Sequence, residues 1–101
     1  MRYFVIGDED TVLGFGLVGV EGTVVAAEDE ARDIFSRVIQ ESEIGVVIIT
    51  ERVADQIREQ VDRYVFTEDF PLILEIPDRR GRIEGRPSLR EVANRAIGIS
   101  V

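Results

Sequence analysis

A run of three acidic residues follows the first apolar segment and could do chemistry. Residues 8–10 (Asp-Glu-Asp) come directly after the β-rich run 3–6 (Tyr-Phe-Val-Ile) and one glycine. In doubly wound α/β folds, ligands gather at the carboxyl ends of the strands, and carboxylate oxygens are suitable ligands for Mg²⁺. The alternative role is structural, because Asp8 or Asp10 can cap a helix that starts here. We favour capping, with weak Mg²⁺ binding as the alternative.

A phosphorelay receiver places metal-binding acids at the same position, so phosphotransfer needs a separate test. A receiver also needs an aspartate at the end of its third strand and a lysine near the end of the domain. Here Thr50 and Glu51 follow the third apolar run, and the chain contains no lysine. We therefore do not expect phosphotransfer.

Residues 14–19 (Gly-Phe-Gly-Leu-Val-Gly) match the dinucleotide fingerprint G-x-G-x-x-G. In that motif the first glycine ends a strand and the loop opens a helix. Gly14 instead lies seven residues beyond Gly7, where the first strand is expected to end. We interpret these glycines as positions of close helix packing and a helix stop, and we predict no bound cofactor.

The missing residue types exclude most other chemistry. The chain has no cysteine and no histidine, and all twelve basic residues are arginine. Thiolate metal sites, disulfides and a histidine base are excluded, as are Schiff-base chemistry and a phosphate-binding lysine. We predict no catalytic, cofactor-binding or metal-binding residue, and expect that the chain is not an enzyme.

The length and hydropathy of the chain predict one small folded domain. Its 101 residues, 45% of them hydrophobic, suffice for one modest core. No apolar run approaches the roughly 20 residues that span a bilayer, and the start of the chain lacks a signal-peptide pattern. We expect a cytoplasmic protein without direct membrane insertion.

Strand and helix patterns alternate along residues 1–78. Helices are expected to begin near residues 8, 28 and 50, and Thr50 can cap the third. The second has its apolar residues at i, i+3, i+4, i+7 and i+8. The run 46–49 consists of four β-branched residues, which is typical of a strand covered on both faces. The expected strands are residues 3–6, 23–27, 46–49 and 71–76.

This order predicts an α/β fold with a receiver-like, Rossmann-like architecture. Right-handed crossovers make all four strands parallel and place them in the order 2-1-3-4, flanked by helices. We assign residues 1–78 to this α/β domain.

Residues 79–101 do not continue the alternation of strands and helices. They are predicted to form a flexible linker followed by a short amphipathic helix. Ser88 and Glu91 have the spacing of a capping box. The helix is too short to be stable alone in water, so it packs either on its own domain or on a partner's helical surface. The candidate partner-binding residues are Leu89, Val92, Ala93, Ala96 and Ile97.

Charge is distributed unevenly between the two parts. Residues 1–78 hold six arginines and eighteen acids, a net charge of −12, whereas residues 79–101 hold six arginines and two acids, a net charge of +4. The acidic body would repel phosphate, so no nucleic-acid partner is expected. The basic segment suits an acidic protein surface or is a solvated linker.

Four blocks in order give the sequence a resemblance to the F subunit of V-type (A/V-type) ATPases. The first block, Val5 to Phe15 followed by Leu17 to Val20, is similar to the most specific stretch of that family. Gly16 stands where a larger residue is common in the family. The other blocks are residues 44–51, 71–77 and 95–99.

The resemblance implies a non-catalytic component of the central stalk of a rotary ATPase. Such a component binds the coiled-coil D subunit, and through it the A/B catalytic ring and the membrane ion-translocating sector. It would be peripheral to the membrane and help couple ATP hydrolysis or synthesis to ion transport. A C-terminal helix that docks and releases would be regulatory. The alternatives are a stand-alone receiver-like signalling or interaction module and a small nucleotide-binding domain.

Overall fold

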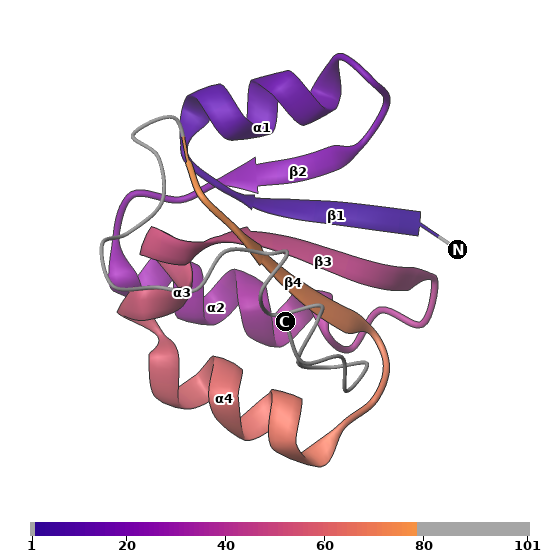
Figure 1. The fold of residues 1–101 in the computed structure, drawn as a ribbon, viewed down its shortest axis with the longest axis vertical. Coiled ribbons are helices and arrows are strands. Elements are labelled where there is room, and N and C mark those ends of the chain that lie inside the picture. The colour runs from indigo at the N-terminus through magenta and orange to yellow at the C-terminus, as the bar shows by residue number, and fades with distance from the viewer. Residues whose placement is uncertain (1, 79–101) are drawn as a thin grey trace, which may run out of the picture.

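A four-stranded parallel sheet forms the centre of the computed structural model, which describes residues 2–78 (Figure 1). The strands lie in the order β2-β1-β3-β4, which confirms the predicted α/β class and strand order. The elements, in chain order, are β1 (Arg2–Gly7), α1 (Glu9–Gly16), β2 (Glu21–Val24), α2 (Glu28–Val38), β3 (Ile44–Thr50), α3 (Glu51–Gln56), α4 (Arg58–Thr67) and β4 (Leu72–Ile76).

One face of the sheet carries the main hydrophobic core. Side chains from β1 and β3 that point to this face pack against α2, α3 and α4. Phe35 of α2 is fully buried, and its ring meets Tyr64 of α4 edge-on with centroids 5.9 Å apart. The most deeply buried members of this cluster are Ile6, Ala31, Phe35, Val47, Ile49, Ala54 and Val61.

The opposite face is covered by α1 over β1 and β2. Val5 and Ile48 are register partners on this face, and both are buried. A Cβ added at Gly22 of β2 would meet Val5 of β1 and the side chain of Val12 on α1. Figure 1 shows α1 beside β2, away from α2 and α4. The helix therefore approaches the sheet closely over β1 and β2.

Side-chain caps start three of the helices. The Asp8 carboxylate accepts from the amide of Thr11 at the start of α1, and the Thr50 hydroxyl accepts from the amide of Val53 at the start of α3. At α2 the Glu30 carboxylate reaches back and accepts from the amide of Ala27 at 3.1 Å. These contacts satisfy amides that have no partner within the helix, and they confirm the predicted capping by Asp8 and Thr50.

Two predicted elements differ most from the structure, while the other strands differ by only one or two residues at their ends. The second strand covers residues 21–24 rather than 23–27, because β2 pairs with β1 from Glu21 to Val24 and the chain then leaves the ladder. The single helix expected after Thr50 is two helices, α3 and α4, which meet at Ile57 with φ −125° and ψ 37°. Ile57 is nonetheless buried, so the apolar stripe remains on one face across the break.

The predicted C-terminal helix and its linker, residues 79–101, lie outside the described residues, and so do the candidate partner-binding residues Leu89, Val92, Ala93, Ala96 and Ile97. Within residues 2–78, no helix combines the length and hydropathy needed to cross a membrane.

Candidate functional site

In the acidic run after β1, Asp8 caps the start of α1. Asp8 accepts hydrogen bonds from the amide and the hydroxyl of Thr11. Partial burial raises the pKa of Asp8, but the hydrogen bonds from Thr11 and from the backbone amides of Asp8 and Asp10 together outweigh it, and the net result is a lowered pKa. Among residues 2–78, no three His, Cys, Asp or Glu side chains lie together so that they could hold a metal ion. Capping is the role that the geometry gives to Asp8.

The glycines of the G-x-G-x-x-G match lie within α1 and the turn after it. Gly14 is inside the helix, Gly16 is its last residue, and Gly19 has φ +87° in the turn that follows. The arrangement is therefore not the strand–loop–helix phosphate cradle. Gly19 supports the predicted helix stop.

The predicted close packing at Gly14 and Gly16 is wrong for the described body. A Cβ added at either position would meet no atom within 4 Å. Glycine inside a helix is less favourable than alanine by about 1 kcal/mol, and packing within residues 2–78 does not compensate for it here.

The carboxyl edge of the sheet carries a shallow apolar groove between α1 and the end of β4. Its volume is ≈ 430 Å³. Arg52 and Asp78 lie at the same edge and form an ion pair of 2.9 Å, in which the Asp78 side chain is almost fully buried. The lining residues are Asp10, Thr11, Gly14, Phe15, Val18, Ile76, Pro77 and Asp78.

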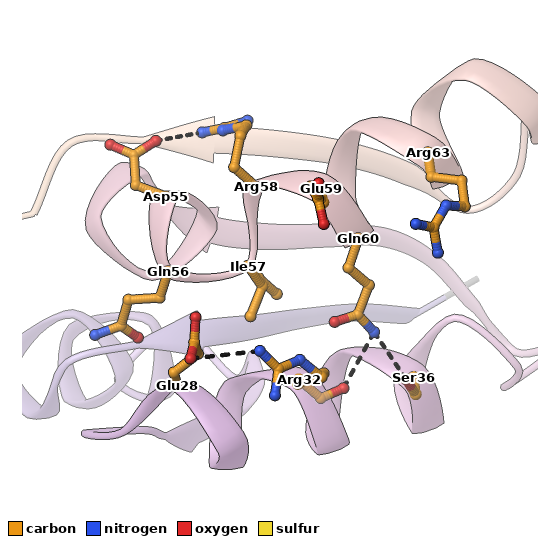
Figure 2. Close-up of a pocket in the computed structure, with 10 residues that line it drawn as sticks. All are labelled: Glu28, Arg32, Ser36, Asp55, Gln56, Ile57, Arg58, Glu59, Gln60 and Arg63. Carbon is orange, nitrogen blue, oxygen red and sulfur yellow. Dashed lines mark hydrogen bonds and ion pairs between the residues drawn. The ribbon is translucent and has the colours of Figure 1, made fainter.

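A second, more polar groove of ≈ 530 Å³ separates α2 from α3 and α4 (Figure 2). The Gln60 amide donates to the carbonyl oxygen of Arg32 at 3.2 Å and to the Ser36 hydroxyl at 2.8 Å. A glutamine amide is not a base, so it cannot activate the Ser36 hydroxyl. The two hydrogen bonds of Gln60 hold α4 against α2. The residues that line the groove form no nucleophile–base pair.

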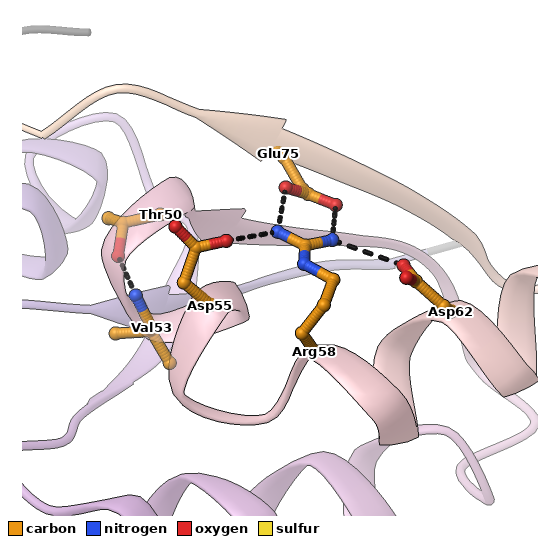
Figure 3. Close-up of polar contacts among 6 residues, drawn as sticks. All are labelled: Thr50, Val53, Asp55, Arg58, Asp62 and Glu75. Atoms are coloured by element: carbon orange, nitrogen blue, oxygen red, sulfur yellow. Dashed lines mark hydrogen bonds and ion pairs between the residues drawn. The ribbon is translucent and has the colours of Figure 1, made fainter. Parts of the chain in front are cut away.

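Arg58 connects the start of α4 to β4 (Figure 3). Its guanidinium makes two bonds of 2.8 Å to the two oxygens of Glu75. It also contacts Asp55 at 2.7 Å and Asp62 at 3.2 Å. The bidentate contact with Glu75 raises the pKa of Arg58, although partial burial opposes the shift. The cluster has the geometry of a structural brace, with one cation held by three carboxylates.

Apart from Tyr3 and Val24, the exposed large apolar side chains of the described residues lie at two places. The first is the outer side of α1 and the turn after it, where Leu13, Leu17 and Val18 are 63%, 82% and 77% exposed. The second lies where α4 leads into β4, and it comprises Val65, Phe66, Phe70 and Leu72. Adjacent exposed apolar residues of this kind mark interaction surfaces. We define the α1 patch as Leu13, Gly14, Gly16, Leu17 and Val18.

The sequence did carry a signal for the α1 patch. Val12, Leu13, Phe15 and Leu17 surround the helix axis, whereas a helix that only packs on its own sheet has one apolar stripe. Val12 and Phe15 are partly buried toward the sheet, and Leu13 and Leu17 face away from it.

Comparison with known proteins assigns the chain to a family. The family model described as ATP synthase (F/14-kDa) subunit matches residues 4–93. The chain belongs to this family of ATP synthase subunits. The F subunit of the A-type ATP synthase of Thermococcus sibiricus is 38% identical, over 100% of this chain and 98% of the relative. That of Methanothermobacter thermautotrophicus is also 38% identical, over 96% of this chain and 92% of the relative.

A solved structure supports the fold of this family member. The crystal structure of the F subunit of the V-type ATP synthase of Archaeoglobus fulgidus superposes with a TM-score of 0.60. Its sequence is 24% identical, and the match covers 74% of this chain and 95% of that chain. The family model and the two relatives confirm the resemblance to F subunits drawn from the sequence, and this structure confirms the receiver-like parallel fold.

Proposed function

We propose that this chain is a non-catalytic central-stalk component of an A/V-type rotary ATPase, which binds the coiled-coil D subunit. The observation that carries the proposal is the extent of the family match. It continues from the α/β body into residues 79–93, and the relative from Thermococcus sibiricus covers the whole chain. The basic segment is therefore a shared part of these proteins.

The D subunit would be bound through the apolar stripe of that segment. A coiled coil presents a continuous helical surface, and a short amphipathic helix gains its stability by packing on such a surface. Through D, the chain would connect to the A/B catalytic ring, where ATP chemistry takes place, and to the membrane ion-translocating sector. In this position the chain is cytoplasmic and peripheral to the membrane.

Regulation would follow from docking and release of the same segment. A helix that docks in one state and is released in another changes how firmly the stalk couples ATP hydrolysis or synthesis to ion transport. Deleting residues 79–101 is expected to alter the ATPase activity of the reconstituted complex. Unchanged activity together with unchanged D binding would contradict both the anchor and the regulatory role.

Binding is tested by size-exclusion chromatography with light scattering on the full chain mixed with its cognate D subunit. We expect a stable one-to-one complex that is weakened when Leu89, Val92 and Ile97 are all changed to serine. Asn94→Ser, on the polar side of the predicted helix, is the matched control and should leave the complex intact. A complex that tolerates the triple change would move the interface to the α/β body, and no complex at all would refute the proposal.

A further inference from the structure

Four exposed apolar side chains form one surface where α4 leads into β4. We call this surface the α4–β4 patch, and it consists of Val65, Phe66, Phe70 and Leu72, which are between 55% and 91% exposed. Figure 1 shows the connection from α4 to β4 at the end of the molecule opposite α1. Because exposed phenylalanine rings are unfavourable in water, the patch gains free energy when another surface covers it.

A hydrogen bond holds the α4–β4 patch in shape. The buried Tyr64 hydroxyl donates to the carbonyl oxygen of Pro71 at 3.3 Å. This bond fixes the connection to α4 and brings Phe70 and Leu72, on either side of Pro71, to the same end of the helix as Phe66. The surface is therefore preformed, and covering it requires little ordering of the chain.

Charged side chains of opposite sign lie at the two ends of the patch. Arg63 lies one helical turn before Phe66, and Glu68 and Asp69 follow the end of α4. All three charged side chains are exposed. The ion pairs of the described residues are formed by other side chains, so these three charges can pair with a partner.

This order of charges indicates which partner fits the patch. A uniformly basic surface would be repelled by Arg63, and a uniformly acidic surface would be repelled by Glu68 and Asp69. A second copy of this chain, related by a twofold axis through the patch, carries the charges in the complementary order. Arg63 of each copy then faces the two carboxylates of the other, and the phenylalanines of both copies pack together in the middle.

We propose that the α4–β4 patch is the contact surface of a symmetric homodimer of the free chain. The net charge of −8 opposes association, but exposed charges more than about 8 Å apart are largely screened at physiological ionic strength. Four side chains from each copy make a small interface, so the dimer is weak and depends on concentration. The inference does not rest on the proposed function, because it concerns the chain before it meets another subunit.

The first test is sedimentation velocity of the full chain at physiological ionic strength and increasing concentration. The parent chain should change from monomer to dimer, and Phe66→Ser should raise the dissociation constant of the dimer at least tenfold. The Phe66 side chain is 91% exposed, so this change should leave the circular dichroism spectrum and the melting temperature of the monomer unaltered. Leu13→Ser/Leu17→Ser, at the α1 patch, is the matched control and should dimerise like the parent chain.

A charge exchange tests the twofold arrangement itself. Arg63→Glu alone should weaken the dimer, and Glu68→Arg/Asp69→Arg should weaken it as well, although this change reduces the net negative charge of the chain. The three substitutions combined should restore the dimer, because each copy contributes both ends of the contact. Two weakened variants that together remain weak would contradict the symmetric pairing.

Other outcomes overturn the inference outright. These are a parent chain that stays monomeric up to millimolar concentration, a dimer that tolerates Phe66→Ser, and a dimer that is lost in the α1 control. If Phe66→Ser weakens only the complex with the cognate D subunit, the patch binds that partner instead. If it changes only hydrogen exchange within residues 88–97 of a monomer, the chain's own segment covers the patch. Both of these results also overturn the homodimer.

Discussion

At the residue scale, Asp8 shows how the contacts of one acidic side chain decide its role. Its position at the carboxyl end of β1 is where a metal or phosphate site would be expected. The structure places its carboxylate on the amide and hydroxyl of Thr11 instead. Both bonds favour the charged form, and the pKa of Asp8 is lowered although partial burial opposes this.

The lowered pKa predicts a pH-dependent contribution to stability. A carboxylate whose pKa is lower in the folded chain stabilises the fold fully above its ordinary pKa of 3.8, and this contribution is lost as the pH falls through the folded value. Asp8→Ala should therefore cost about 1 kcal/mol near neutral pH, and the two proteins should converge in strong acid. Thermal unfolding as a function of pH measures this.

Asp8→Asn is the control for this prediction, because asparagine keeps the cap and does not titrate. Its stability should therefore lack the loss in acid that the parent chain shows. A cost for Asp8→Ala that persists unchanged in strong acid would show that the carboxylate charge is not what stabilises α1.

At the element scale, the close approach of α1 to β1 and β2 depends on Gly22. A Cβ at this position would lie 2.7 Å from the backbone oxygen of Val5, and even closer to the Val5 side chain. The neighbouring atoms on the other side belong to Val12 of α1, at 3.2 Å. Neither a backbone oxygen nor a buried branched side chain can move aside easily.

Gly22→Ala should therefore destabilise the chain by about 1–3 kcal/mol, the range for overpacked cores. Gly14→Ala is the matched control, since it adds the same methyl group to open space and removes a helix-breaking residue. The two substitutions should shift the denaturation midpoint in opposite directions in urea titrations. Equal shifts of the same sign would mean that Gly22 does not lie as closely against Val5 of β1 and Val12 of α1 as described.

The elements also show which features the sequence revealed and which it did not. The run 46–49 predicted a strand buried on both faces, and the caps at Asp8 and Thr50 were evident from residue type, because both signals are local. The break between α3 and α4 at Ile57 was not predicted. No glycine or proline marks it, and the apolar spacing of Val53, Ile57 and Val61 is that of one continuous helix.

Contacts between distant parts of the chain explain why the break between α3 and α4 was not predicted. Arg58 begins α4 directly after the break and binds Glu75, seventeen residues away on β4, with both oxygens. A local pattern cannot report such a pairing. The same holds for the α1 patch: the apolar residues could be read from the sequence, but which of them face the sheet depends on how α1 lies on β1 and β2.

At the scale of the whole molecule, the main core of residues 2–78 lies on the α2–α4 face of the sheet. Its side chains come mainly from α2, α3 and α4 and from the two central strands. We propose that residues 1–78 are one α/β domain and that residues 79–101 are a separate partner-binding part.

We therefore predict that a chain ending at residue 78 folds by itself. Its far-ultraviolet circular dichroism should show the helices and strands of the body, and its thermal unfolding should remain cooperative. A second truncation, ending at residue 70 and lacking β4, is the control and should not fold, because β3 would lose one of its two pairing partners and Arg58 would lose Glu75. Non-cooperative unfolding of the 1–78 chain would instead make residues 79–101 part of the folding unit.

The position of β4 has a mechanical consequence. β4 is hydrogen-bonded to β3 in parallel from Leu72 to Ile76, and the chain continues beyond Asp78 toward the segment proposed to grip the stalk. A pull on that segment directed along β4 would load the bonds to β3 in shear, so that they must yield together rather than one after another. The ion pairs of Arg58 with Glu75 and of Arg52 with Asp78 resist the same pull. A pull along β4 would therefore be opposed by the whole ladder and by both ion pairs at once.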